Sequence, residues 1–192
     1  MTYKLSNFEP RHDFNELIKV NAKNSFNRPE GNETFILNYF ELKFIDKVIG
    51  KVTTPKISFI KKTVLLGLEN ESSDARVSFW SDEDENKLSY NKHGSINLDK
   101  LSISEGDVFG LGIVFPPSNN IYSKLLCPHI FATHNGVLIG KKFLLLEMPM
   151  TPFVGLRFCS GQLNFGDDLD SRPFVYDVKK YEVDGDFYRL QD

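Results

Sequence analysis

The sequence predicts an all-β protein, built as a sandwich or a barrel. Many short segments alternate apolar and polar residues with the period of two that a half-buried strand requires. Clusters of Gly, Pro, Asn, Asp and Ser separate these segments and favour turns. The 17 phenylalanines among 192 residues suit a thick core between two sheets, and this length fits one domain.

The clearest predicted strand covers residues 35–44, where one face is apolar and the other becomes polar at Glu41 and Lys43. The apolar face carries Ile36, Phe40, Leu42 and Phe44. Similar runs predict strands at 56–60, 63–68, 76–80, 107–115, 121–133, 137–143, 152–158 and 162–165. Regularly spaced short strands are typical of antiparallel sheets.

A β-hairpin is predicted around Asn135 and Gly136, because this dipeptide supplies both positive-φ positions of a type I′ turn. The flanking arms, 131–134 and 137–139, are rich in β-prone residues. Only residues 15–20 and 177–188 could form short helices. The chain therefore contains little predicted helix.

No cofactor or metal site is predicted. Cys127 and His129 could share a strand face, but His134 lies five residues from His129 and should point the opposite way. The acidic run 82–86 fails as a calcium loop because Lys87 and His93 stand where Gly and Glu are needed. It reads as a solvated loop.

The glycines of segment 106–112 have the spacing of neither a dinucleotide fingerprint nor a P-loop. They lie inside an apolar strand and should permit close packing of a neighbour. No Gly-x-Ser-x-Gly elbow is present, and the four histidines lack a recognisable nucleophile nearby. The sequence thus predicts no enzyme.

The 26 acidic and 23 basic residues give a net charge of −3, which argues against a nucleic-acid or anionic-membrane partner. The sequence offers no signal-peptide pattern and no apolar run long enough to cross a membrane, so an intracellular location, cytoplasmic or nuclear, is expected. In a reducing compartment Cys127 and Cys159 should remain thiols.

Nine short motifs follow one another along the chain: 20–24 (VNAKN), 39–42 (YFEL), 64–68 (VLLGL), 89–94 (SYNKHG), 106–113 (GDVFGLGI), 130–136 (IFATHNG), 152–156 (PFVGL), 164–166 (NFG) and 173–177 (PFVYD). Taken in this order, they resemble the SPRY family, and most closely its Ran-binding-protein-M-like branch. The family's "GW" is replaced by 77–80 (VSFW), and segments 116–128 and 167–172 lengthen two connections.

The resemblance implies a bent antiparallel β-sandwich of the concanavalin-like jelly-roll kind. It implies one SPRY-type domain over residues 1–192, with a core at 15–178. It also implies a non-catalytic adaptor that binds a protein or a short peptide through a loop-built surface. The adaptor would serve as a substrate receptor or scaffold for a ubiquitin ligase.

By position, the resemblance places the partner-binding surface on three parts of the chain. These are Lys23, Asn24 and Ser25; Asn70 and Arg76 at the ends of one loop; and Arg157, Phe158 and Cys159. Arg157 and Phe158 are residue types that dominate binding hot spots, although Phe158 could instead belong to the core. Trp80, the one tryptophan, is expected to be buried.

Two alternative functions remain. One is a lectin-like sandwich that binds carbohydrate through exposed aromatic and Asn or Asp side chains. The other is a scaffold subunit of a chromatin-modifying complex, a role that the family also includes. A noncanonical enzyme would need a pocket joining His129, His134 or Asp167 to a nucleophile.

Overall fold

The computed structural model describes residues 17–45, 62–70, 72, 76–81, 86–90, 95–98, 103–118, 127–143 and 148–183. Within these ranges, residues 81, 86–90, 95–98, 142 and 143 are described by their backbone alone. Predictions that fall on 56–60, 82–85, 121–126 and 184–188 lie outside the described residues.

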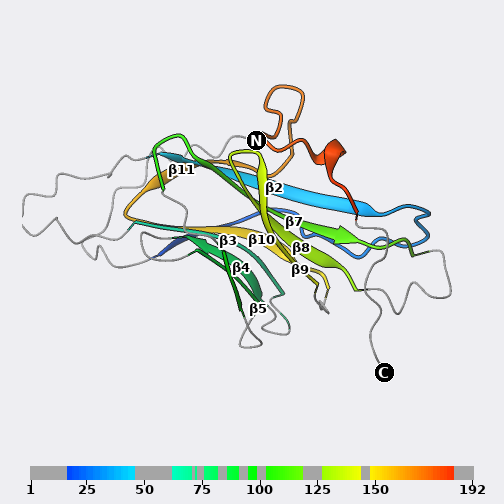
Figure 1. Ribbon diagram of the computed structural model, residues 1–192. Helices are drawn as coiled ribbons and strands as arrows, with labels where there is room; N and C mark the ends of the chain where they lie inside the picture. Colours follow the sequence, from blue (N-terminus) through cyan, green and yellow to red (C-terminus); the bar gives the residue numbers. More distant parts are fainter. Residues whose placement is uncertain are drawn as a thin grey trace, which may run out of the picture.

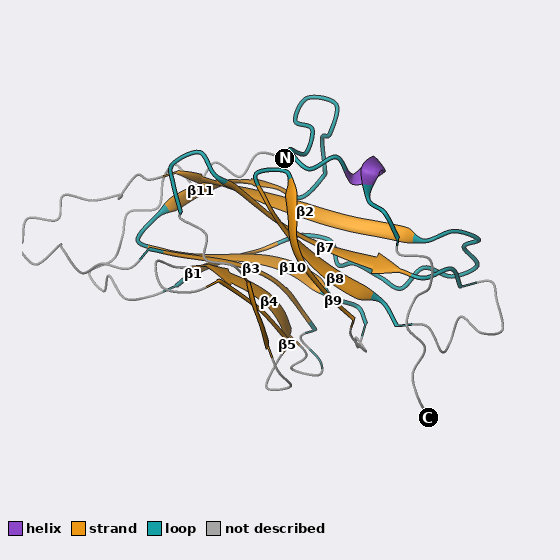
Figure 2. Cartoon of the chain, viewed as in Figure 1, coloured by secondary structure: helices purple, strands orange, loops and turns teal. Residues whose placement is uncertain are grey.

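Two antiparallel sheets pack face to face as a β-sandwich, which confirms the predicted fold class (Figures 1 and 2). The six-stranded sheet has the order β1-β10-β3-β4-β5-β6, and the five-stranded sheet has the order β11-β2-β7-β8-β9. The first sheet consists of β1 (Ile18–Asn21), β10 (Thr151–Arg157), β3 (Thr63–Glu69), β4 (Arg76–Ser81), β5 (Asn86–Tyr90) and β6 (Ser95–Leu98). The second consists of β11 (Ser160–Asn164), β2 (Ile36–Ile45), β7 (Val108–Phe115), β8 (His129–His134) and β9 (Val137–Phe143).

Three strands were not predicted. β1 occupies part of the segment 15–20 that could have formed a short helix, and Ile18 to Val20 form a strand instead. Backbone pairing with β10 over four residues decides the conformation there, since a segment this short has too little helical propensity to resist it. The short strands β5 and β6 also escaped prediction, because they are rich in Asn, Lys and Ser.

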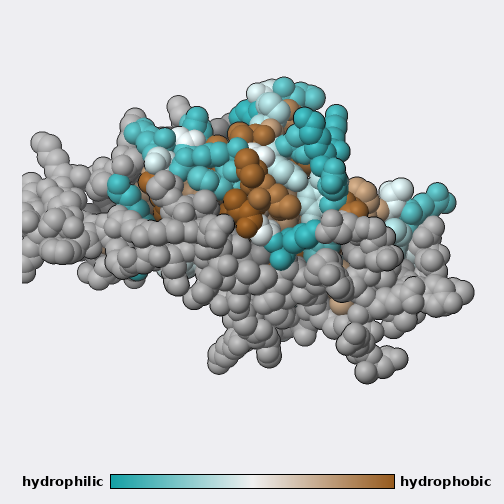
Figure 3. All heavy atoms as spheres, in the orientation of Figure 1, coloured by the Kyte–Doolittle hydropathy of each residue, from teal (hydrophilic) through white to brown (hydrophobic). Residues whose placement is uncertain are grey.

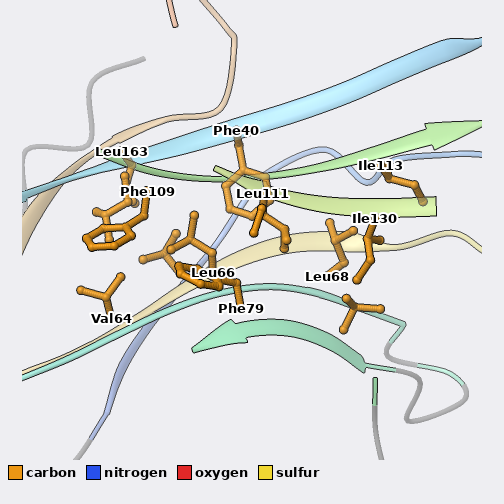
Figure 4. Close-up of a cluster of buried hydrophobic side chains, with 14 of the residues drawn as sticks. Phe40, Val64, Leu66, Leu68, Phe79, Phe109, Leu111, Ile113, Ile130 and Leu163 are labelled. Carbon is orange, nitrogen blue, oxygen red and sulfur yellow. The ribbon is translucent and has the colours of Figure 1, made fainter. Parts of the chain in front are cut away.

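The main core lies between the two sheets and is made of large apolar side chains from both (Figure 4). Phe40, Leu42 and Phe44 of β2 are at most 1% exposed, as the alternation in that strand predicts. Facing residues from the six-stranded sheet include Leu66 and Phe79.

A second, smaller core covers the outer face of the five-stranded sheet. The segment after β11 crosses this face, where Figure 1 shows it lying over β2, and includes the short 3₁₀ helix η3 (Val178–Lys180). Phe174 packs edge-on against Tyr39 at 4.9 Å between ring centroids, and Tyr181 meets Phe131 at 4.5 Å. The molecule therefore has three layers where this segment lies.

Glu41 fixes this third layer, and its predicted exposure is wrong. Its carboxylate is 4% exposed and accepts hydrogen bonds from the backbone N–H groups of Val175 and Tyr176, both at 2.9 Å. It also accepts one at 2.9 Å from the Tyr39 hydroxyl, which lies 2.6 Å from the Thr133 hydroxyl. Burial, reinforced by the neighbouring Glu41, raises the pKa of Tyr39 far above its usual value. Lys43, the other polar residue of that face, is exposed as predicted.

The predicted hairpin and the predicted role of the glycines are both confirmed. Asn135 and Gly136 have φ values of 48° and 77° between β8 and β9. In β7, a Cβ at Gly110 would overlap the Tyr39 hydroxyl, and one at Gly112 would overlap the Phe131 ring. The aromatic side chains on the outer face of the five-stranded sheet therefore rest on these glycines.

Candidate partner-binding site

The predicted site residues lie at opposite ends of β10. The loop of Lys23, Asn24 and Ser25 lies against the start of this strand, where the Ser25 and Thr151 hydroxyls are 2.7 Å apart. Arg157, Phe158 and Cys159 lie at its far end. Six residues of strand separate the ends by roughly 20 Å, so the structure does not bring all the predicted residues together.

Asn70 and Arg76 lie near the same end of β10 as Lys23. Strand pairing sets Glu69 opposite Thr151 on one side and opposite Arg76 on the other. Asn70 is only 8% exposed, and its side-chain oxygen accepts a hydrogen bond at 2.8 Å from the Ser72 backbone N–H. Asn70 thus shapes the turn and offers little surface to a partner.

A recess of about 330 Å³ opens beside Lys23 and Asn24. Phe26, Phe165 and Pro152 give it an apolar lining, while Lys23, Asn24 and Asp167 add polar groups. Its lining residues are Ala22, Lys23, Asn24, Phe26, Pro152, Phe165 and Asp167. A mostly apolar hollow with a few polar groups of both signs is what a ligand-binding site requires.

The core and the backbone hold this recess in shape. Phe26 and Phe165 both pack against the buried Phe40, at 6.4 and 5.6 Å between ring centroids. The Ala22 N–H donates to the Pro152 carbonyl at 2.8 Å. On the other side, Asn164 accepts from the Gly166 N–H at 3.1 Å and donates to the Arg172 carbonyl at 2.9 Å. The recess is therefore largely preformed.

A layer of charged side chains covers the neighbouring outer face of the six-stranded sheet. Lys19 and Arg76 both lie over the buried ring of Phe153, at 4.6 and 4.5 Å from its centroid. Glu69 forms an ion pair with Lys19 and accepts a hydrogen bond at 3.3 Å from the Asn21 side chain. Arg76 is exposed, so this layer continues the polar surface around Lys23.

The far end of β10 forms a compact turn into β11. The Arg157 guanidinium donates to the Thr63 hydroxyl at 3.0 Å, and the Cys159 thiol donates to the Thr63 carbonyl at 3.5 Å. Phe158 has a φ of 57°, which breaks the strand alternation, and it is partly exposed. These contacts give Arg157 and Cys159 local structural roles.

Trp80 and the two cysteines were also singled out from the sequence. Trp80 is partly exposed, so its expected full burial is wrong: it lies in β4 between the core-facing Phe79 and the end of the strand. Neither Cys127 nor Cys159 forms a disulfide. Burial raises the pKa of the Cys127 thiol, although the charge of Arg28 opposes the rise.

The two histidines of β8 point to opposite faces, as their spacing predicts. His129 Nε2 lies 2.6 Å from the Tyr181 hydroxyl, and burial lowers the pKa of His129 to about 4, helped by the charge of Lys141. His134 stacks on Phe109 and lies 3.3 Å from Asp107. Burial raises the pKa of Asp107, but hydrogen bonds from Asn135, Ser104 and His134 outweigh it and leave the pKa below its usual value.

The described residues contain no group of three or more His, Cys, Asp or Glu side chains placed to hold a metal ion. The recess that contains Asp167 is lined by neither a histidine nor a Ser, Thr or Cys nucleophile. In the described part of the chain, no helix has the length and apolarity to cross a membrane.

Of the residues that line this recess, the sequence analysis selected Lys23 and Asn24 for partner binding but not Ala22, Phe26, Pro152, Phe165 or Asp167. The NFG segment gave a signal for Phe165, yet nothing in the sequence set it beside Phe26. Asp167 lies in one of the lengthened connections, and the sequence analysis considered it only as a member of a possible catalytic pocket.

Comparison with known proteins gives structural likeness alone. No protein-family model matches the chain, and no curated protein matches it in sequence. A human SPRY domain is similar in structure, with 18% identity over 76% of this chain and 81% of that chain and a TM-score of 0.47.

Two other solved structures match at lower scores. Scytalido-glutamic peptidase with a peptide-based transition-state analogue is 10% identical over 76% of this chain and 74% of that chain, with a TM-score of 0.39. Basic winged bean lectin with Tn-antigen is 9% identical over 74% of each chain, with a TM-score of 0.35. At these scores the likenesses carry no argument about activity.

Proposed function

We propose that this chain is a non-catalytic protein-interaction module of the SPRY type, which binds a short peptide or a partner protein at the recess beside Lys23. The observation that carries the proposal is the preformed recess itself, with Phe26 and Phe165 as an apolar floor and Lys23 and Asp167 among its polar groups. The order of the SPRY-like segments along the chain supports it. Loops carried by a rigid sandwich are a common place for binding sites.

In this proposal Lys23, Asn24, Ser25 and Arg76 form the partner-binding surface. Arg157, Phe158 and Cys159 lie at the other end of β10 and are not part of this surface. The finer role is that of an intracellular adaptor, in the cytoplasm or nucleus, that recruits a partner to a ubiquitin ligase of the Ran-binding-protein-M-like kind. This assignment rests on the sequence resemblance.

Affinity purification with mass spectrometry tests the proposal. Lys23→Glu with Asn24→Ala changes two exposed residues of the recess, and Arg157→Ala with Phe158→Ala provides the far-end control. We expect recovery of specific partners to fall about tenfold or more with the first pair, as for a lost hot spot. Recovery should stay near the wild-type level with the second pair, provided that circular dichroism shows a folded chain.

The opposite pattern would place the site at the far end of β10 and overturn the proposal. Recovery of ubiquitin-ligase subunits would support the adaptor role, whereas recovery of chromatin-modifying subunits would favour the scaffold role. A glycan array that binds the wild-type chain strongly, with no protein partner recovered, would instead establish a lectin.

A further inference from the structure

A second recess, of about 230 Å³, lies next to the proposed site along the chain. Phe115, Pro116 and Pro117 supply apolar lining, and Arg28 and Glu30 add charge. None of these residues was predicted from the sequence to bind a partner. Segment 22–31 contributes to both recesses: its first residues line the first recess, and its last residues line the second.

This shared segment is anchored at several points. Phe26 exchanges two backbone hydrogen bonds with Met150, at 2.8 and 3.0 Å. Beyond the second recess, the Ser118 N–H donates to the Asn32 carbonyl at 3.0 Å, and the Asn32 N–H donates to the Ser118 hydroxyl at 3.1 Å. The Ser118 hydroxyl also donates to the Asn32 side-chain oxygen. A segment held at both ends loses little conformational freedom when a ligand binds.

The backbone of the segment offers an edge for pairing. In an antiparallel pair, the residues on either side of a doubly hydrogen-bonded residue direct their N–H and C=O groups away from the paired strand. Here those residues are Ser25 and Asn27, and within the described part of the chain neither makes a backbone–backbone hydrogen bond. The Ser25 carbonyl accepts only a long hydrogen bond, at 3.5 Å, from the exposed Asn27 side chain, which a peptide can displace. An extended peptide could add at this edge, as in strand addition.

The side chains of the segment indicate the charge of that peptide. Lys23 and Arg28 are both exposed, and neither forms an ion pair with any described residue. Glu30 is the one acidic residue of segment 22–31. An acidic side chain between two apolar ones would complement this arrangement.

We infer that the ligand of the proposed site is an extended peptide that spans both recesses, with an apolar side chain in each and acidic residues between them, one near Lys23 and one near Arg28. This inference rests on the proposed function. Glu30 follows Asn24 by six positions, which is roughly 20 Å if the segment is extended. The peptide therefore needs about six or seven residues to reach from one recess to the other.

The test begins with a phage-displayed library of random peptides about twelve residues long, which exceeds the required span. Selection on the wild-type chain should enrich sequences with two apolar positions flanking Asp or Glu. A fluorescent synthetic copy of the enriched peptide then reports binding by anisotropy. Affinity should fall about tenfold with Arg28→Glu and with Pro117→Glu, and it should decrease as salt is raised.

The matched control is Lys179→Glu, which reverses an exposed charge on η3. It should leave peptide affinity unchanged. If Lys23→Glu abolishes binding while Arg28→Glu and Pro117→Glu have no effect, the first recess is the site and the two-recess inference is wrong. If the library yields no peptide while partner proteins are still lost with Lys23→Glu and Asn24→Ala, the inference is also wrong and the proposed function stands.

Discussion

Glu41, on the outer face of the five-stranded sheet, shows that the burial of a polar residue must be known before its role can be assigned. Strand alternation placed Glu41 on the solvent side of β2. That side is correct, but a segment 134 residues later covers it. A period-two pattern reports which face a residue occupies, and it contains no information about what lies on that face.

Replacing Glu41 by alanine should lower the free energy of unfolding by about 3 kcal/mol. The change leaves the N–H groups of Val175 and Tyr176 without their acceptor and removes one of the two partners of the buried Tyr39 hydroxyl. Urea denaturation measures the effect. Lys43→Ala, on the same face but exposed, should cost less than about 0.5 kcal/mol, and equal losses for the two variants would contradict the role given to Glu41.

His129 should make the protein less stable as the solution becomes mildly acidic. Its pKa is about 4 in the folded chain and about 6.5 when unfolded. Below pH 6.5 the unfolded chain therefore binds the proton more readily, and stability falls as the pH drops from about 6.5 to 4. The full effect is about 3 kcal/mol. Urea denaturation at several pH values gives the free energy of unfolding of the wild type and of His129→Gln. Between pH 6.5 and 4 this free energy should fall by about 3 kcal/mol more in the wild type. An equal fall in the two proteins would refute the prediction.

Elements differ in how far their sequences determine them. The β8–β9 hairpin was predictable because its turn chemistry is local. The strands β2, β3, β7 and β9 were predictable from alternation or continuous apolar character. β1, β5 and β6 were not, since their strand state depends on pairing with neighbours rather than on their own residues.

The two glycines of β7 should resist substitution. Gly110→Ala would force apart the Tyr39 and Thr133 hydroxyls, and Gly112→Ala would displace the Phe131 ring. Each variant should lose about 1 to 3 kcal/mol of stability, as overpacked positions do. Thermal melting checks this. Gln162→Ala on β11, an exposed position, should melt close to the wild type.

At the scale of the whole molecule, the proposed site depends on which ends of distant elements meet. The sequence supplied Lys23 and Asn24, but Phe165 lies about 140 residues further along. Arg157, Phe158 and Cys159 were grouped with Lys23, although the antiparallel course of β10 past β1 separates them. Only the strand order and direction, which no local pattern encodes, could show this.

The three layers should unfold as one unit. We expect the amide hydrogens of Val175 and Tyr176 to exchange as slowly as those of β2, although neither residue belongs to a strand, because both donate to the buried Glu41. Hydrogen exchange followed by nuclear magnetic resonance measures this. In Glu41→Ala, these two amides should exchange fast while those of β3 stay slow, and fast exchange of Val175 and Tyr176 in the wild type would show that the outer layer opens independently.

The contact between Glu41 and the outer layer also has an evolutionary consequence. The carboxylate binds main-chain N–H groups, which every residue except proline provides. Position 175, whose side chain is 56% exposed, should therefore accept almost any residue among related sequences but exclude proline, whereas position 41 should remain acidic. Variation at one partner and constancy at the other would leave no covariation between them, so this link between distant segments would stay invisible to methods that infer contacts from paired changes.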